Sequence, residues 1–301
     1  MLTVRHCTVR RVIVAVVVTH SAPRHVLERC LGALQAAGGV DRIIVVDNGD
    51  RAAVIDAALI NAGVELIRTL NHGYGAAANA GFTLARGLGA DVVALLNDDV
   101  VVHDGWIEPL LAELTGARVG AVQPKLLIAG TSPARINSLG VAIGPDGAGT
   151  DIGHGEIDLG GHAPSDLRLF TGGAVVFAAD FLIATGGFDE RYFLYYEDVD
   201  LARRGGALGW RYRLVPTSVV EHVGGVTTGN DPAATRFHQE RNRLRAAVRH
   251  ADGATIVRAF WLSVRRLRHA PRAIHRRALV AGLGSTPRTL FERLSGRNVA
   301  A

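Results

Sequence analysis

The sequence contains 301 residues, of which 48% are hydrophobic and 20% are charged. This length and composition exclude a disordered chain and predict one large globular domain, or one domain with an appendage. The two cysteines, Cys7 and Cys30, form neither a disulfide framework nor a metal-ligand spacing, so we expect two inert thiols in a reducing cytoplasm. No stretch approaches the roughly 18 apolar residues of a membrane span, so any membrane contact is expected to be peripheral.

Charge is distributed unevenly along the chain. Residues 232–301 contain 15 Arg and 3 acidic residues, a net charge of +12, whereas residues 1–231 contain 18 basic and 25 acidic residues, a net charge of −7. This difference predicts a first region at residues 1–230 and an Arg-rich helical region at 231–301. A basic region of this kind binds either nucleic acid or an anionic lipid surface, and composition alone does not choose between them.

Strand and helix patterns alternate through the first hundred residues. Apolar, β-branched runs typical of strands buried on both faces lie within residues 11–20, 41–50, 64–70 and 91–100. Apolar residues at helical spacing lie within 23–39, 52–63 and 75–89. The basic and apolar start of the chain also resembles a short secretory signal, but the matching strand that follows favours a strand. The alternation predicts an α/β fold with a parallel sheet and right-handed crossovers.

Polar side chains follow each predicted strand at its carboxyl end, the edge where open parallel sheets bind ligands. These side chains are Thr19, His20, Asp47, Asn48, Arg68, Asn71, Asn97, Asp98 and Asp99. One polar strand end is typical of a turn, but four at one edge predict a nucleotide-sized site, and paired carboxylates suit a divalent cation. The glycines of NHGYGAAANAG match neither the dinucleotide-binding G-x-G-x-x-G pattern nor a Walker loop, which disfavours a dehydrogenase or a P-loop enzyme.

The second half begins near Val119 and is harder to interpret. A stretch rich in Gly, Pro and Ser that extends to about Asp166 predicts loop and a short hairpin. Further along, Glu197, Asp198 and Asp200 precede a predicted helix in YYEDVDLARR. Acidic residues stabilise the positive end of a helix dipole, so helix capping is an alternative to catalysis for one or two of them.

Seven segments occur in order within residues 11–230: VVVTHSAP, IIVVDNGD, NHGYGAAANAG, LLNDDV, TGGAVVF, GGFDERYFLYYEDVDLARR and EHVGG. Taken together, they resemble glycosyltransferase family 2 enzymes of GT-A fold, and within that family the rhamnosyltransferase-like branch. The resemblance implies a Rossmann-like α/β domain with a mostly parallel central sheet, here followed by a basic helical C-terminal extension.

For the donor, the resemblance implies a nucleoside-diphosphate sugar and a divalent metal ion, Mg²⁺ or Mn²⁺. The positions that match the family's nucleotide-sugar site are Thr19, Asp47, Asn48, Arg68, Asn71, Gly73, Asn97 and Asp98. Asp99 matches the metal-binding carboxylate, and His222 matches a histidine near the diphosphate that we group with Asp99 as a metal ligand. Commoner family patterns carry Asp or Pro in the LLNDDV triplet, so the uncharged Asn97 leaves the number of carboxylate ligands open.

For catalysis, the resemblance implies inversion of the anomeric centre in a single displacement. The Glu-Asp motif of the family places the catalytic base on Asp198, and we assign Glu197 to orienting the site or capping the helix. Gly172, Gly173 and Asp189 lie in segments that resemble the acceptor side.

The C-terminal segment 258–284 mixes aromatic and aliphatic residues with arginines at helical spacing, the composition of an amphipathic helix that lies on a membrane surface. The alternative is a helical appendage that packs on the GT-A domain. The resemblance favours the first, because enzymes of this branch glycosylate polyprenyl-diphosphate-linked saccharides at the inner face of the membrane.

The sequence therefore predicts a cytoplasmic enzyme, peripherally bound to the membrane, that moves L-rhamnose from dTDP-L-rhamnose to a lipid-linked saccharide in cell-wall or polysaccharide biosynthesis. One alternative keeps the fold and changes the donor to a UDP-hexose or UDP-galactofuranose. Another is a nucleic-acid-binding protein that uses the basic tail. The net acidic body, without the aromatic platforms of single-strand binders, disfavours nucleic acid as a partner.

Overall fold

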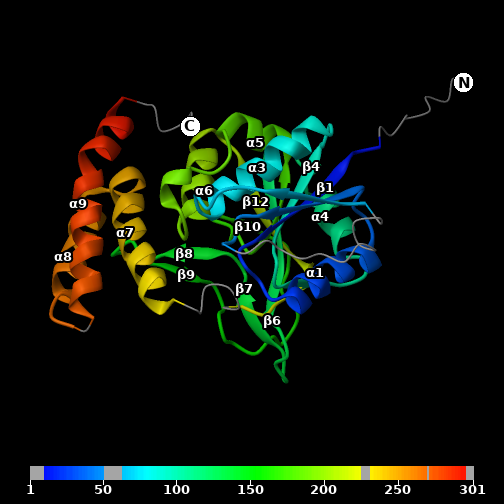
Figure 1. The fold of residues 1–301 in the computed structure, drawn as a ribbon, viewed down its shortest axis with the longest axis horizontal. Helices are drawn as coiled ribbons and strands as arrows, with labels where there is room; N and C mark the ends of the chain where they lie inside the picture. Colours follow the sequence, from blue (N-terminus) through cyan, green and yellow to red (C-terminus); the bar gives the residue numbers. More distant parts are fainter. Residues whose placement is uncertain (1–9, 51–62, 225–230, 270, 296–301) are drawn as a thin grey trace, which may run out of the picture.

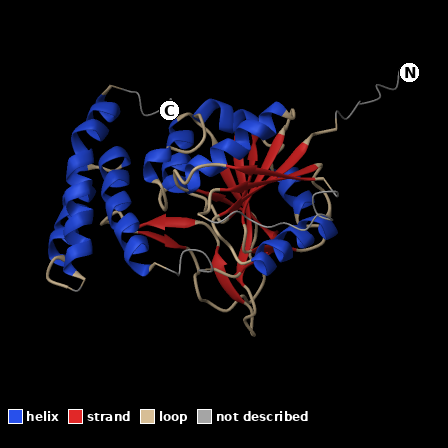
Figure 2. Ribbon diagram, viewed as in Figure 1, coloured by secondary structure: helices blue, strands red, loops and turns tan. Residues whose placement is uncertain are grey.

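The computed structural model describes residues 10–50, 63–224, 231–269 and 271–295. A central mixed β-sheet carries helices on both faces, and three C-terminal helices stand together beside it (Figure 1). Figure 2 shows the same separation of the strand-rich body from the helical C-terminal part. The chain thus has an α/β fold with a helical extension, as predicted.

The first half of the sheet is parallel. Strand β1 (Ile13–Thr19) lies between β2 (Arg42–Asp47) and β4 (Val92–Asn97), and β3 (Val64–Arg68) pairs with β2. The intervening helices are α1 (Arg24–Ala37) and α3 (Tyr74–Gly87). These strands and helices confirm the elements predicted there. The helix predicted over 52–63 lies outside the described residues except for its last residue, and so does Cys7.

The second half makes the sheet mixed. Strand β11 (Ala174–Ala178) runs antiparallel to both β4 and β6 (Val119–Ile128), and β6 pairs in parallel with the long strand β12 (Arg211–His222). Three short antiparallel strands extend it, namely β5 (Val100–Val102), β7 (Arg135–Ser138) and β10 (Ser165–Leu167). The predicted hairpin is β8 (Val141–Ile143) with β9 (Gly149–Asp151), but β7 and β10 occupy parts of the stretch predicted as loop.

Two hydrophobic cores cover the two faces of the sheet. One lies under α1 and α4 (Ile107–Glu113) and includes Leu31 and Leu110, both fully buried. The other lies under α3, α5 (Ala179–Thr185) and α6 (Glu197–Ala207), where Phe177 and Phe181 stack at 5.7 Å between ring centroids. Cys30 belongs to the first core, and burial raises the pKa of its thiol, as expected of an inert thiol.

The C-terminal region packs on the sheet-bearing body rather than standing free. Helix α7 (Pro232–His250) begins with Asp231 as N-cap and lies between the body and helices α8 (Gly253–Arg266) and α9 (Arg272–Leu294) (Figure 1). The Arg249 guanidinium lies 2.5 Å from Asp189 and 3.0 Å from Asp200, and His250 lies 2.7 Å from Asp200. Both carboxylates are buried.

The prediction of a single amphipathic helix over 258–284 is wrong. Helix α8 ends at Arg266, and a second helix, α9, begins at Arg272 after Pro271. The contacts of Arg249 and His250 show that α7 packs on the domain, while membrane contact by α8 and α9 stays a prediction. Within the described residues, no helix is both long and apolar enough to cross a membrane.

Candidate active site

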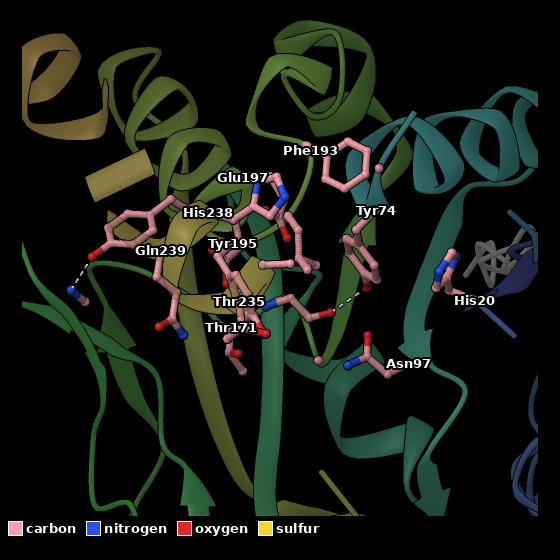
Figure 3. A pocket seen from close by; sticks show the side chains of 18 of the residues that line it. His20, Tyr74, Asn97, Thr171, Phe193, Tyr195, Glu197, Thr235, His238 and Gln239 are labelled. Carbon is pink, nitrogen blue, oxygen red and sulfur yellow. Dashed lines mark hydrogen bonds between the residues drawn. The ribbon is translucent and has the colours of Figure 1, made fainter. Parts of the chain in front are cut away.

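A cavity of about 1120 Å³ opens at the carboxyl ends of β1, β2 and β4 and continues toward α7. It has a strand end, formed by Asn48, Asn71, Gly73 and residues 97–99, and a loop end, formed by residues 148–151, 193–198, 234–236 and 238–240. Figure 3 shows part of this lining, with Asn97 and Tyr74 on one side and Glu197, Thr235 and Gln239 on the other. Of the predicted site residues, the following line it: Asn48, Asn71, Gly73, Asn97, Asp98, Asp99, Gly172, Gly173, Glu197, Asp198 and His222.

Three predicted nucleotide-site residues lie behind or beside the cavity wall. Thr19 and Asp47 are each 1% exposed. The Asp47 carboxylate accepts a hydrogen bond from the Gly49 N–H at 2.9 Å and lies 3.7 Å from the Arg68 guanidinium. Asp47 is thus placed to shape the turn after β2, and its carboxylate does not face the cavity.

Asp189 lies between the body and α7. Its carboxylate is 5% exposed and pairs with Arg191 at 2.6 Å and with Arg249 of α7 at 2.5 Å. Burial is the largest single influence on the pKa of Asp189 and raises it. Hydrogen bonding from Arg191 and the charges of Arg191 and Arg249 outweigh burial, so the pKa is lowered overall. Asp189 therefore joins α7 to the body and is not among the residues that line the cavity, and its acceptor-side assignment stays a prediction.

Asp99 and His222 form a close pair at the strand end. The His222 Nε2 atom lies 3.0 Å from one Asp99 oxygen, and the other Asp99 oxygen accepts from the Gly224 N–H at 3.0 Å. His222 Nδ1 lies 3.1 Å from the side-chain oxygen of Asn137. The Asn97 amide nitrogen lies 3.5 Å from His222 Nε2, so one carboxylate and two side-chain amides surround the imidazole ring.

This donor set fits a divalent cation. A carboxylate oxygen and an imidazole nitrogen are both ligands for Mn²⁺, and oxygen ligands suit Mg²⁺. Within the described ranges, no group of three or more His, Cys, Asp and Glu side chains could hold a metal. A cation here would therefore need further ligands from a bound molecule, such as diphosphate oxygens.

Two consecutive glycines separate this pair from the acidic residues at the loop end. A Cβ atom on Gly173 would lie 3.6 Å from His222, and one on Gly172 would lie 3.5 Å from Asp198. The Gly172 N–H donates to the Asp198 carboxylate at 2.9 Å, and its carbonyl accepts from the Tyr74 hydroxyl at 2.9 Å, the dashed contact at Tyr74 in Figure 3. The Gly172–Gly173 backbone thus lies between the predicted base, Asp198, and the predicted metal ligand His222.

Glu197 and Asp198 are held differently. Asp198 accepts from two backbone N–H groups, those of Gly172 and Val199 at 2.7 Å, whereas within the described residues Glu197 Oε2 is buried without a hydrogen-bond partner. Burial raises the pKa of both carboxyls, and the neighbouring Asp198 charge raises that of Glu197 further. The two backbone N–H groups stabilise the ionised form of Asp198, whereas Glu197 Oε2 lacks such donors among the described residues, so Asp198 is the better placed proton acceptor.

Asp200, the third acid of this motif, has a structural role. It is fully buried, and Arg204 of the same helix donates to it at 2.8 Å. Burial is the largest single influence on the pKa of Asp200 and raises it, but hydrogen bonding from His250 and the charges of Arg204, His250 and Arg249 together outweigh burial and lower the pKa.

The cavity also has a wall that the sequence did not predict. Thr235, His238 and Gln239 of α7 and Asp151 of the hairpin line its loop end. The only signal for α7 was its start, where Asp231 precedes Pro232, a pairing typical of a capped helix N-terminus. Nothing in the sequence placed that helix against the carboxylates.

Comparison with known sequences identifies the body. The sequence model of Glycosyl transferase family 2 matches residues 14–141, which include the strand end of the cavity. Residues 14–141 are a glycosyltransferase family 2 domain. The pre-mycofactocin glycosyltransferase of Mycobacterium tuberculosis is 30% identical over 274 residues, which cover 86% of this chain and 52% of that protein. This chain therefore spans about half the length of that relative.

A second relative matches over a shorter stretch. The N-acetylglucosaminyl-diphospho-decaprenol L-rhamnosyltransferase of Mycobacterium tuberculosis is 46% identical over 67 residues, 22% of each chain.

Solved structures agree on the GT-A fold. GalNAc-T7 with UDP, GalNAc and Mn²⁺ superposes with a TM-score of 0.67 at 15% identity, over 96% of this chain and 58% of that one. Staphylococcus aureus TarS superposes with a TM-score of 0.56 at 12% identity, over 95% and 82%.

Proposed function

We propose that this chain is an inverting glycosyltransferase that uses a nucleoside-diphosphate sugar. The observation that carries this proposal is the Gly172–Gly173 backbone, which touches Asp198 on one side and borders His222, the partner of Asp99, on the other. A displacement reaction needs groups for the leaving diphosphate and for the attacking hydroxyl on opposite sides of one carbon atom. The family 2 domain and its GT-A fold support the same activity.

At the strand end, Asp99 and His222 would hold a divalent cation. Bound there, the cation would supply Lewis-acid stabilisation of the charge that develops on the leaving diphosphate. The structural relatives GalNAc-T7 and the Pyrobaculum calidifontis mannosyltransferase PcManGT, solved with Mn²⁺ and nucleotide or nucleotide sugar, support a cation of this type. The Asn48, Asn71 and Asp98 side chains would bind and orient the nucleotide.

At the loop end, the Asp198 carboxylate would accept the proton of the acceptor hydroxyl. As that proton leaves, the hydroxyl oxygen bonds to the anomeric carbon and the bond from that carbon to the diphosphate oxygen breaks. The two backbone N–H groups that donate to Asp198 fix the direction of its carboxylate. Glu197, whose pKa is raised by burial and by the Asp198 charge, would donate a hydrogen bond rather than accept a proton.

For the donor, we infer dTDP-L-rhamnose, with a UDP-hexose or UDP-galactofuranose as the alternative. The rhamnosyltransferase relative supports L-rhamnose, and it does so at higher identity over a shorter stretch than the pre-mycofactocin glycosyltransferase. For the acceptor, the same relative supports a lipid-linked saccharide. The longer match to the other relative makes a pre-mycofactocin-like acceptor the second candidate.

A panel of nucleotide sugars tests the donor. The purified chain is mixed with dTDP-L-rhamnose, UDP-glucose, UDP-galactofuranose or GDP-mannose, with Mg²⁺ or Mn²⁺, and both thermal unfolding and nucleotide release are followed. A ligand at 100 times its dissociation constant should stabilise the fold by about 2.7 kcal/mol. We expect dTDP-L-rhamnose to give the largest shift and to be consumed. Equal responses to all four would contradict the donor assignment, and no response at all would contradict the proposed activity.

We also propose that the outer face of α8 and α9 lies on an anionic membrane. On α8, exposed Val257, Trp261 and Val264 recur at helical spacing, and the Arg265 guanidinium lies 4.6 Å from the Trp261 ring centroid. Exposed arginines occur on both helices, among them Arg258 on α8 and Arg272 and Arg276 on α9. Basic and apolar side chains on one helix face favour the headgroup region of a bilayer.

Vesicle sedimentation tests this surface. We expect the chain to sediment with phosphatidylglycerol vesicles and not with phosphatidylcholine vesicles, and Trp261→Glu to release it. Leu159→Glu is the matched control, because Leu159 is 90% exposed on the body, far along the chain from α8. Salt-sensitive binding to a single-stranded oligonucleotide, without vesicle binding, would favour the nucleic-acid alternative instead.

A further inference from the structure

The loop that leads into α6 has an unusual backbone. Phe193 has φ 65° and ψ −58°, and the Leu194 N–H donates to the Tyr192 carbonyl at 2.8 Å, which together define a γ-turn of the rare, strained form. Tyr195 and Tyr196 follow with φ of 68° and 71°, in the left-handed region that residues with side chains rarely adopt. Tyr196 is the N-cap of α6, so Glu197 and Asp198 are the first residues beyond this loop.

A strained backbone persists only where its surroundings determine it. On one side, the Tyr74 N–H donates to the Phe193 carbonyl at 2.7 Å. A Cβ atom on Gly73 would lie 2.2 Å from that carbonyl oxygen, so the loop closes directly on a residue without a side chain. On another side, the Tyr196 hydroxyl accepts from the Gly149 N–H at 2.9 Å. These contacts hold the two ends of the loop.

Side chains of α7 hold the middle of the loop, and Asn242 makes most of these contacts. The Asn242 amide nitrogen lies 2.8 Å from the Tyr192 carbonyl oxygen, 2.7 Å from that of Leu194 and 2.8 Å from that of Tyr195, so one of its two N–H groups is shared between two acceptors. Asn242 is fully buried. Its amide orientation is fixed, because carbonyl oxygens can only accept and because the Arg241 guanidinium donates to the Asn242 carbonyl oxygen at 2.9 Å.

We propose that Asn242 is a positioning residue, whose amide holds residues 192–196 in the strained conformation that presents Glu197 and Asp198 to the cavity. This inference rests on the proposed function for its effect on rate, but not for its effect on the loop. Residues 192–196 are held by a helix that begins more than thirty residues later, so α7 is part of the catalytic apparatus and not an appendage to it.

The first readout does not depend on any donor. Chymotrypsin cleaves after Phe and Tyr, and residues 192–196 read YFLYY. We compare the wild type, Asn242→Ala and Asn242→Asp, in which a carboxylate of the same size faces three carbonyl oxygens. Mass spectrometry then identifies the first cut. We expect the wild-type loop to resist cleavage and both variants to be cut first within 192–196.

The matched control is Asn79→Ala. Asn79 also clamps backbone, because its amide nitrogen donates to the Phe188 carbonyl at 2.9 Å and its carbonyl accepts from the Phe188 N–H at 2.9 Å. It acts upstream of the strained loop and does not line the cavity. We expect this variant to lose thermal stability without new cleavage within 192–196.

The second readout is the kinetics of donor consumption. Misplacing a catalytic group by about 1 Å can cost about 100-fold in rate, so Asn242→Ala should lower kcat about 10- to 100-fold while the KM for donor changes less than about twofold. Asn79→Ala should keep its kcat.

Unchanged cleavage and unchanged kcat in a folded Asn242→Ala would overturn the inference, and so would equal kcat losses in the Asn242 and Asn79 variants. If the wild type consumes no nucleotide sugar, the proposed function fails, while the cleavage pattern still decides whether Asn242 holds the loop.

Discussion

The strand end of the cavity is built from the ends of parallel strands, whereas its loop end is built from a strained loop, a hairpin turn and a helix of the C-terminal region. At the strand end, hydrogen-bonded ladders between β1, β2 and β4 fix where Asn97 and its neighbours lie. At the loop end, the carboxylates depend on contacts between segments about fifty residues apart in sequence. The strand end of the cavity is thus positioned by the pairing of the parallel strands, whereas the loop end is positioned by contacts between segments that are far apart in the sequence.

Removing the C-terminal region is the strongest test of this difference. Truncation after Asp231 would remove Arg249 and His250, the partners of Asp189 and Asp200, and breaking a buried pair costs about 3–5 kcal/mol. Since a typical domain is stable by only about 5–15 kcal/mol, we expect this variant not to fold. Circular dichroism and thermal unfolding measure the loss.

Truncation after Asp252 is the matched comparison, because it keeps α7 and removes α8 and α9. We expect a folded but less stable protein, since Leu244 of α7 packs against Gly282 of α9. A cooperative unfolding transition in the variant cut after Asp231 would show that the body folds without α7 and would contradict the packing argument.

At the strand end, Asp99→Ala should abolish transfer. Without this carboxylate, His222 loses its partner and a cation would lose its only charged ligand in the pair. Because a Lewis-acid metal contributes several kcal/mol, we expect a fall of at least about 10³-fold in transfer rate. Asp104→Ala, which removes an exposed carboxylate shortly after β5, is the control. Full activity of Asp99→Ala, or of the wild type in excess chelator, would contradict a metal role.

These two ends also differ in how far the sequence predicts them. Asn97 and Asp98 end an uninterrupted apolar run, and the pleat of a buried strand carries them to the sheet edge, so a local pattern was sufficient. The buried ion pair of Asp189 could not be predicted, because its partner Arg249 lies sixty residues later and no local pattern indicates such a pair. Likewise, Asn242 in RNRLRAAVRH has no local signal for three carbonyl partners on a distant loop.

At the loop end, the Asp198→Asn variant tests whether Asp198 acts as the catalytic base or binds the nucleotide. It keeps the shape of the side chain but removes the proton acceptor, so donor affinity should stay nearly constant while transfer falls about 10²- to 10⁴-fold. Glu197→Gln should do less, because Glu197 is assigned to donating a hydrogen bond. Calorimetry for donor affinity beside transfer rates decides the assignment. Parallel loss of donor binding in Asp198→Asn would move Asp198 to the nucleotide site, and a more damaging Glu197→Gln would exchange the two roles.

The pH dependence of transfer gives a smaller, graded test of the same carboxylate. Burial raises the pKa of Asp198 to about 6, and only the ionised form accepts a proton. We therefore expect kcat to fall as pH decreases through about 6. The charge of Asp151 contributes to raising this pKa, so Asp151→Asn should move the acidic limb to lower pH. An acidic limb that is unchanged in Asp198→Asn would assign the titration to another group.

The smallest effect is expected at Asp47, where two variants separate its charge from its hydrogen bond. Asp47→Asn keeps an oxygen for the Gly49 N–H and removes the charge opposite Arg68, whose side chain is 52% exposed, so the Arg68 contact is worth at most about 1 kcal/mol. Asp47→Ala leaves the Gly49 N–H unpaired, at a cost of about 1–3 kcal/mol, in a turn that closes tightly on Ser21 of the cavity wall.

We therefore expect Asp47→Ala to weaken donor binding by about tenfold, and Asp47→Asn by less than about fivefold, with or without metal. Calorimetry with the nucleotide diphosphate measures both. If the two variants lose equal affinity, the carboxylate charge itself serves the nucleotide, as the family resemblance implies. If neither variant loses affinity, Asp47 is only a turn residue, and the strand end binds the nucleotide through the residues that face the cavity.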